Sequence, residues 1–136
     1  MDKVTSTLST EEFDHVAEKS KSILARMTKL PSKTLGSVTN GPYRNFFLPS
    51  HVSPKHPFRS VGEFFDQYRQ MLSSAVQENS KSVLFYLPHN VAIQFTHGGL
   101  LPQNILVSGS NMSAIVDWST AGFYPASWEC CCTQLS

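Results

Sequence analysis

The sequence predicts an α+β fold that is mainly helical and carries one small β-hairpin. Two stretches with helical periodicity, residues 9–29 and 60–78, predict the helices. Two β-branched runs, residues 105–107 and 114–116, flank a turn-rich segment and predict the hairpin. At 136 residues the chain suits one domain, residues 1–136, because a globule of this size buries roughly two thirds of its unfolded surface.

The first helix is predicted over residues 9–29. Ser9 and Glu12 form a capping box, in which the hydroxyl accepts from an early helical amide and the carboxylate reaches back to the cap. Pro31 should stop the helix. The apolar side chains that follow at spacings of three, four and seven are Phe13, Val16, Ala17, Ile23, Leu24 and Met27.

The second helix is predicted from a second capping box, Ser60 and Glu63, to about Glu78. Its expected buried face consists of Val61, Phe64, Phe65, Tyr68, Leu72, Ala75 and Val76. Between the helices, residues 31–59 contain five of the eight prolines and predict a long irregular connection. The aromatic and basic residues 41–47 suggest that part of this connection packs on the domain.

A short extended segment is predicted at residues 92–95, before a pair of glycines. The hairpin follows, with residues 105–107 and 114–116 as its strands and residues 108–113 as a slightly long turn.

The composition excludes several classes of partner. Eleven Lys and Arg are balanced by ten Asp and Glu, so we expect no nucleic-acid partner. No apolar run is long enough for a membrane span, and the first residues lack the apolar core of a secretory signal. The three cysteines are consecutive, residues 130–132, which suits reduced thiols and a cytoplasmic location rather than a disulfide framework or a zinc site.

The segment from His97 to Asn104, followed by Asp117, is the most informative motif. The catalytic loop of kinases has a His, any residue, an Asp, a Leu, three more residues and an Asn, and a metal-binding Asp follows. Here His97, Asn104 and Asp117 fall at these offsets, together with Leu100. Gly99 occupies the position of the catalytic aspartate, so we assign no catalytic residue.

These residues resemble the aminoglycoside phosphotransferase-like family, and more narrowly its fungal group of small-molecule kinase-like proteins. The resemblance is specific over residues 95–125, has its motif core in residues 83–129 and extends weakly back to residue 22. It implies a protein-kinase-like fold, of which this chain would be a partial carboxyl lobe. It also implies ATP and Mg²⁺ as cofactors and a hydroxyl of a small molecule as substrate.

By position in the family motif, Asn104 and Asp117 would be metal ligands and His97 would support the loop. Three further positions depart from the family pattern: Leu101 replaces a histidine, Ser119 replaces an acid, and Cys130 follows Trp128-Glu129.

The sequence also lacks the parts that clamp ATP. Its glycines form no G-x-G-x-x-G cluster and no Val-Ala-Ile-Lys-like strand is present, so we expect the amino lobe to be absent. Without nucleotide, Asn104 and Asp117 are a weak Mg²⁺ pair.

Three hypotheses follow. The preferred one is a truncated phosphotransferase-like pseudoenzyme that is inactive alone. The second is a protein-interaction module whose partner covers the exposed lobe interface. The third is a kinase that becomes active when another chain supplies the amino lobe and Glu63, Asp66 or Glu129 replaces the missing base.

Overall fold

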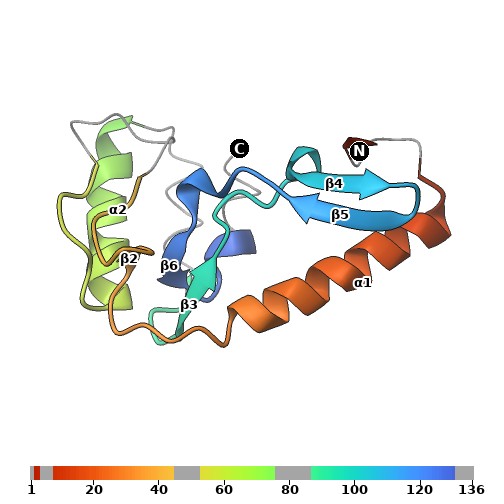
Figure 1. Ribbon diagram of the computed structural model, residues 1–136. Coiled ribbons are helices and arrows are strands. Elements are labelled where there is room, and N and C mark those ends of the chain that lie inside the picture. The colour runs from red at the N-terminus through yellow and green to blue at the C-terminus, as the bar shows by residue number, and fades with distance from the viewer. Residues whose placement is uncertain (1, 4–7, 45–52, 76–86, 131–136) are drawn as a thin grey trace.

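The computed structural model describes residues 2–3, 8–44, 53–75 and 87–130 and is shown in Figure 1. In this part of the chain the strands form two three-stranded antiparallel sheets. The first sheet has the order β1 (Asp2–Lys3), β4 (Ile105–Ser108), β5 (Asn111–Ile115). The second has the order β2 (Gly36–Ser37), β6 (Gly122–Pro125), β3 (Ile93–Thr96).

The helices flank these sheets on opposite sides of the molecule. Helix α1 (Thr10–Met27) runs along the β4–β5 hairpin, and α2 (Val61–Ala75) stands beside the second sheet (Figure 1). The α+β class is confirmed, but "mainly helical" is not supported, since the described residues form two sheets instead of one hairpin. The extra strands are two to four residues long and pair with distant segments, so no local alternation of side chains predicts them. None of the helices in the described residues combines the length and apolar character needed to cross a bilayer.

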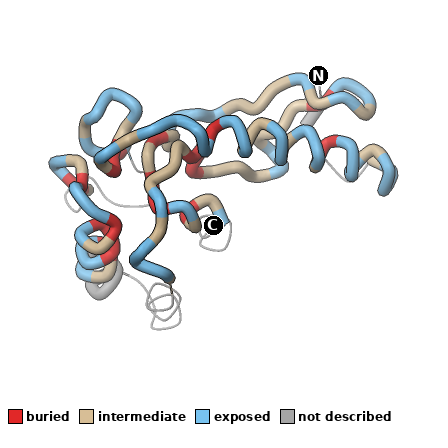
Figure 2. Tube along the Cα trace, turned by 90° about the horizontal axis from the view of Figure 1, so that it is seen from below, coloured by how far each residue is buried: buried red, intermediate tan, exposed pale blue. Residues whose placement is uncertain are grey.

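Helix α1 begins where the capping box predicts. Ser9 is the N-cap: the Glu12 amide donates to its hydroxyl at 3.3 Å, and the Ser9 amide donates to the Glu12 carboxylate at 2.8 Å. The helix ends at Met27, before Pro31 is reached. The predicted apolar stripe is only partly confirmed, because Val16 and Met27 are buried whereas Phe13 is 55% exposed. Figure 2 shows that most of α1 is exposed or only partly buried.

Helix α2 also follows its capping residues, with one difference. The Glu63 amide donates to the Ser60 hydroxyl at 3.1 Å, but the Glu63 carboxylate accepts from the Arg59 amide at 2.9 Å instead of from the cap residue. The predicted buried face is confirmed at Val61, Phe64, Phe65 and Tyr68. Residues 76–78, the predicted end of this helix, and the side chains of Leu72 and Ala75 lie outside the described residues.

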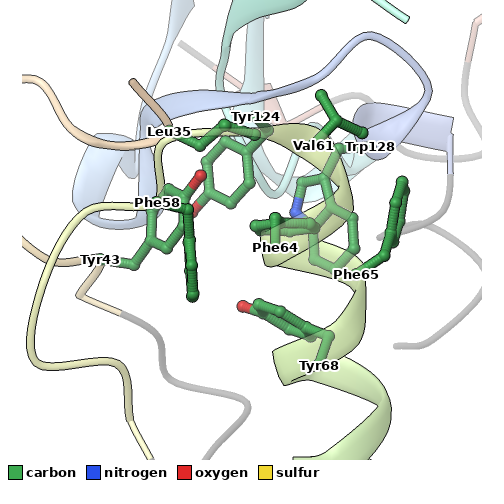
Figure 3. Close-up of a cluster of buried hydrophobic side chains, with 9 residues drawn as sticks. All are labelled: Leu35, Tyr43, Phe58, Val61, Phe64, Phe65, Tyr68, Tyr124 and Trp128. Atoms are coloured by element: carbon green, nitrogen blue, oxygen red, sulfur yellow. The ribbon is translucent and has the colours of Figure 1, made fainter. Parts of the chain in front are cut away.

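An aromatic core joins α2 to the second sheet (Figure 3). Tyr43 stacks on Tyr124 with ring centroids 4.3 Å apart, and Tyr124 lies parallel to Trp128 at 5.6 Å. Phe64 contacts Trp128 edge-on at 4.9 Å, which adds to the stabilisation from buried area. This core fixes the chain on either side of residues 125–127. It also confirms at Tyr43 that the long connection packs on the domain, whereas residues 45–47 of the predicted segment lie outside the described residues.

The β4–β5 hairpin is longer than predicted. Its ladder runs from Ile105 paired with Ile115 to Ser108 paired with Asn111, so Gly109 and Ser110 form a two-residue turn. The predicted turn of residues 108–113 was therefore too long. A register shift between Leu106 and Val107 accommodates one extra residue on β5. This bulge interrupts the alternation of side chains from which a strand is predicted.

Tyr43 gives the fold a predicted dependence on alkaline pH. Burial raises the pKa of its phenol above the ordinary value near 10, with smaller contributions from Tyr124 and Tyr68. The unfolded chain ionises Tyr43 near pH 10 while the folded chain keeps the proton. Stability is therefore complete below pH 10 and falls above it by about 1.4 kcal/mol per pH unit.

Urea unfolding at several pH values between 8 and 11 would measure this slope. Tyr43→Phe should lower stability at pH 8 by about 1 kcal/mol, because it removes the bond that the phenol donates to the Phe123 carbonyl. The same variant should flatten the alkaline slope by one proton. An unchanged slope in Tyr43→Phe would show that another group causes the loss.

Candidate functional site

The candidate site is the loop that connects β3 to β4. Strand β3 ends at Thr96, and the loop runs from His97 to the short 3₁₀ turn η1 (Pro102–Asn104), after which β4 begins. The predicted extended segment at 92–95 is thus confirmed within one residue. The second 3₁₀ turn, η2 (Trp118–Thr120), follows β5 and packs beside this loop.

The carboxylate of Glu129 binds the backbone of the loop. One oxygen, Oε2, accepts from the amides of His97 at 2.9 Å and Gly98 at 3.3 Å, and Oε1 accepts from the Leu100 amide at 3.1 Å. Glu129 is placed by its neighbour Trp128, which is buried in the aromatic core. Three otherwise unpaired loop amides are therefore satisfied by one acid about thirty residues further on.

The sequence motif did not reveal this role of Glu129. Glu129 had been considered only as a replacement base, but its oxygens accept from the loop amides. The other two acids of that hypothesis are also engaged: Glu63 with the Arg59 amide, and Asp66 with Arg69 at 3.2 Å. The signal that could have indicated this role is the series of loop amides, because buried amides must find an acceptor.

His97 links the loop to the segment before Asp117. Its imidazole is fully buried, and Nε2 lies 2.9 Å from the Val116 carbonyl. Since a carbonyl only accepts, Nε2 carries a proton. Thr120 donates its hydroxyl to the His97 carbonyl at 3.2 Å, and the Trp118 ring contacts the imidazole at 4.6 Å. The loop and η2 are thus tied together through His97.

The two glycines of the loop have different structural requirements. Gly98 has φ +82°, and a Cβ there would lie 2.7 Å from the Thr120 carbonyl oxygen. Gly99 is not in the left-handed region, and a Cβ there would meet only the Thr120 hydroxyl at 3.7 Å, an ordinary contact. The backbone requires glycine at 98 but accepts a side chain at 99, the position of the missing base.

The two proposed metal ligands come together at one end of the hairpin. The Val116 amide donates to the Asn104 carbonyl at 2.9 Å. Asp117 therefore directly follows the backbone partner of Asn104. The Asn104 side-chain amide donates to the Gly99 carbonyl at 2.8 Å. Asp117 is exposed, adopts the left-handed conformation with φ 61°, and accepts from the Ser119 hydroxyl at 2.6 Å.

Asn104 and Asp117 each offer an oxygen atom of the kind that Mg²⁺ binds. Asn104 uses its nitrogen for the loop, which leaves its Oδ1 without a hydrogen bond in the described residues, and Asp117 offers an accessible carboxylate. Both are hard oxygen donors, and Mg²⁺ is often held by one or two carboxylates completed by phosphates and water. The described part of the chain contains no group of three His, Cys, Asp or Glu residues that could hold a metal alone.

The cysteine prediction is only partly covered. Cys130 is a free, exposed thiol, whereas Cys131 and Cys132 lie outside the described residues.

The chain matches the family described as phosphotransferase enzyme family, over residues 3–133. A search of curated proteins and a search of solved structures each found no match. The match includes the loop, the hairpin and Glu129, and it starts well before residue 22, where the resemblance in the sequence began. The chain therefore belongs to the phosphotransferase enzyme family.

Proposed function

We propose that this chain is a kinase-like phosphotransferase homologue that does not transfer phosphoryl groups by itself. The observation that carries the proposal is Gly99, which offers no base to a substrate hydroxyl. Glu129, the acid bonded to this loop, is engaged with three amides. A general base contributes typically about 10²–10⁴ in rate, or roughly 3–5 kcal/mol.

The cation-binding oxygens are retained in weakened form. Asp117 and the Oδ1 atom of Asn104 would hold Mg²⁺, which in this family neutralises the phosphates of ATP. The family glutamate position beside them carries Ser119, whose hydroxyl bonds Asp117. With one carboxylate and no glycine-rich phosphate loop in these 136 residues, the polypeptide alone should bind MgATP poorly.

His97 acts in this proposal as a positioning residue. Its bond to the Val116 carbonyl fixes the residue that precedes Asp117, while Glu129 fixes the loop from the other side. The chain would then preserve the geometry of the loop without its chemistry. A small-molecule hydroxyl, the substrate class of the family, would find no proton acceptor at position 99.

Two alternatives remain from the sequence. An interaction module would expose apolar side chains to a partner, and Trp118 beside Asp117 is 42% exposed. Gel filtration of the purified chain with candidate partners would support it through a defined complex. An enzyme that needs a separately supplied amino lobe would be supported by turnover when that lobe is added.

Gly99→Asp tests the proposal directly. The variant should fold with stability within about 1 kcal/mol of the original chain, since the site accommodates a Cβ. It should still show no phosphorylation of small alcohols in the presence of MgATP, because nucleotide binding is not restored. Thermal unfolding with and without MgATP would measure binding, and product formation would measure turnover.

Asp117→Asn provides the matched control, because it removes the remaining carboxylate from the same site. We expect MgATP to leave the melting temperature unchanged in each of the three proteins, the original chain, Gly99→Asp and Asp117→Asn. A clear MgATP stabilisation that Asp117→Asn abolishes, or turnover by the original chain, would contradict the proposal. Turnover by Gly99→Asp would contradict the expectation that the chain binds MgATP poorly.

A further inference from the structure

The net charge of +1 conceals a strongly basic segment. Residues 19–62 contain no Asp or Glu, yet they hold eight of the eleven Lys and Arg. The cations are therefore not interspersed with acids in this part of the chain. Lys21 pairs with Glu18 at 2.7 Å, and no other cation of the segment forms an ion pair within the described residues. The eight are Lys19, Lys21, Arg26, Lys29, Lys33, Arg44, Lys55 and Arg59.

An open hollow of about 740 Å³ lies within this segment, against strand β6. The apolar residues that line it are Pro31, Val38, Pro57 and Phe123, and the polar ones include Lys33 and Asn40. Small-molecule sites usually measure roughly 300–1,000 Å³ and combine apolar walls with a few polar groups. Size and lining therefore suit a small molecule with an apolar body.

The walls of the hollow are held in place by backbone pairing. Strand β2 pairs with β6, with Gly36 opposite Phe123, and Leu35 exchanges two backbone bonds with Phe58 at 2.9 and 2.8 Å. The turn beyond β2 is closed by the Ser37 amide, which donates to the Gly41 carbonyl at 2.9 Å. A ligand would find this surface formed in advance, which reduces the entropy cost of binding.

Aromatic contacts also connect the hollow to η2, which packs beside the β3–β4 loop. Phe123, in its wall, contacts Phe95 of β3 with centroids 5.5 Å apart. Phe95 lies parallel to Trp118 at 6.3 Å, and Trp118 directly follows Asp117. Phe95 thus connects the lining of the hollow to the residue next to Asp117.

We propose that this hollow binds a small organic anion. The carboxylate or phosphate of the ligand lies at Lys33, and its apolar body packs on Phe123 and the two prolines. An anionic headgroup is the natural complement, because Lys33 has no acidic partner among the described residues and its segment supplies none. An extended polyanion fits less well, since only Lys33 of the eight cations lines the hollow. The inference does not depend on phosphoryl transfer.

The test is a binding titration of the full chain followed by ¹⁵N chemical shifts, without nucleotide. The probes are 3-phenylpropanoate, phenyl phosphate and, as the uncharged match, 3-phenylpropanol. We expect the anions to shift the amides of residues 32–40 and Phe123 and to bind about tenfold more tightly than the alcohol. The tighter of the two anions identifies the headgroup.

Two lysine variants distinguish a site from general attraction. Lys33→Gln should raise the Kd of the anions about tenfold and leave that of the alcohol unchanged. Lys29→Gln removes a charge from the same acid-free segment, outside the lining, and should change the Kd less than twofold. Equal losses in both variants, equal affinity for the alcohol and the anions, or no shift at residues 32–40 would overturn the proposal.

Discussion

Replacing Glu129 by alanine should lower the free energy of unfolding by about 3 kcal/mol. The change removes the acceptor of three loop amides, those of His97, Gly98 and Leu100. Hydrogen bonds to charged groups are each worth about 1.5–3 kcal/mol, and water can replace part of this because Glu129 is half-buried. A domain of this size has only about 5–15 kcal/mol of stability, so the loss should be large. Urea unfolding monitored by tryptophan fluorescence would measure it.

Two control variants separate the loop bonds from the loss of an acid. Glu129→Gln keeps one acceptor oxygen but places an NH₂ group against the remaining loop amide, so about half of the loss should persist. Asp66→Ala removes an exposed acid whose only described ion pair is with Arg69, and it should cost less than about 1 kcal/mol. If Glu129→Ala were no more destabilising than Asp66→Ala, the carboxylate would not hold the loop.

The sequence predicted those parts of the structure that depend on neighbouring residues. Capping boxes involve residues three apart, so the starts of α1 and α2 were found at Ser9 and Ser60. The hairpin was found from its β-branched strands, although its turn was not, because the register shift broke the alternation. The loop and its Asn104–Asp117 pair were found because their spacing is fixed along the chain.

The rest depends on partners far apart in the sequence. The second sheet pairs β2 with β6, whose residues are separated by more than eighty positions, and its strands are too short to show a pattern. Glu129 reaches the loop because its neighbour Trp128 is buried in the aromatic core. The hollow exists because Pro31, Pro57 and Phe123 converge. No periodicity encodes such contacts, whereas the absence of acids from residues 19–62 is visible in the sequence itself.

Gly98→Ala should destabilise the chain by about 3 kcal/mol, whereas Gly99→Ala should change its stability by less than about 1 kcal/mol. At position 98 an alanine in the left-handed region costs about 1–2 kcal/mol. Its Cβ would also lie 2.7 Å from the Thr120 carbonyl oxygen, so η2 must shift and the bond from Thr120 to the His97 carbonyl would weaken. At position 99 the methyl group meets only an ordinary contact, and it restricts the unfolded chain, which favours folding.

The pair is internally matched, since each variant adds one methyl group to the same loop, one residue apart. Urea unfolding gives the two free energies. The amide shifts of Leu100 and Glu129 show whether the loop bonds survive in Gly99→Ala. Equal destabilisation would mean that the fold also requires the glycine at 99, and its presence there would then be structural. A difference of about 2 kcal/mol or more would separate the two glycines: the one at 98 is required by the backbone, and the one at 99 removes a base from a loop that could still hold one.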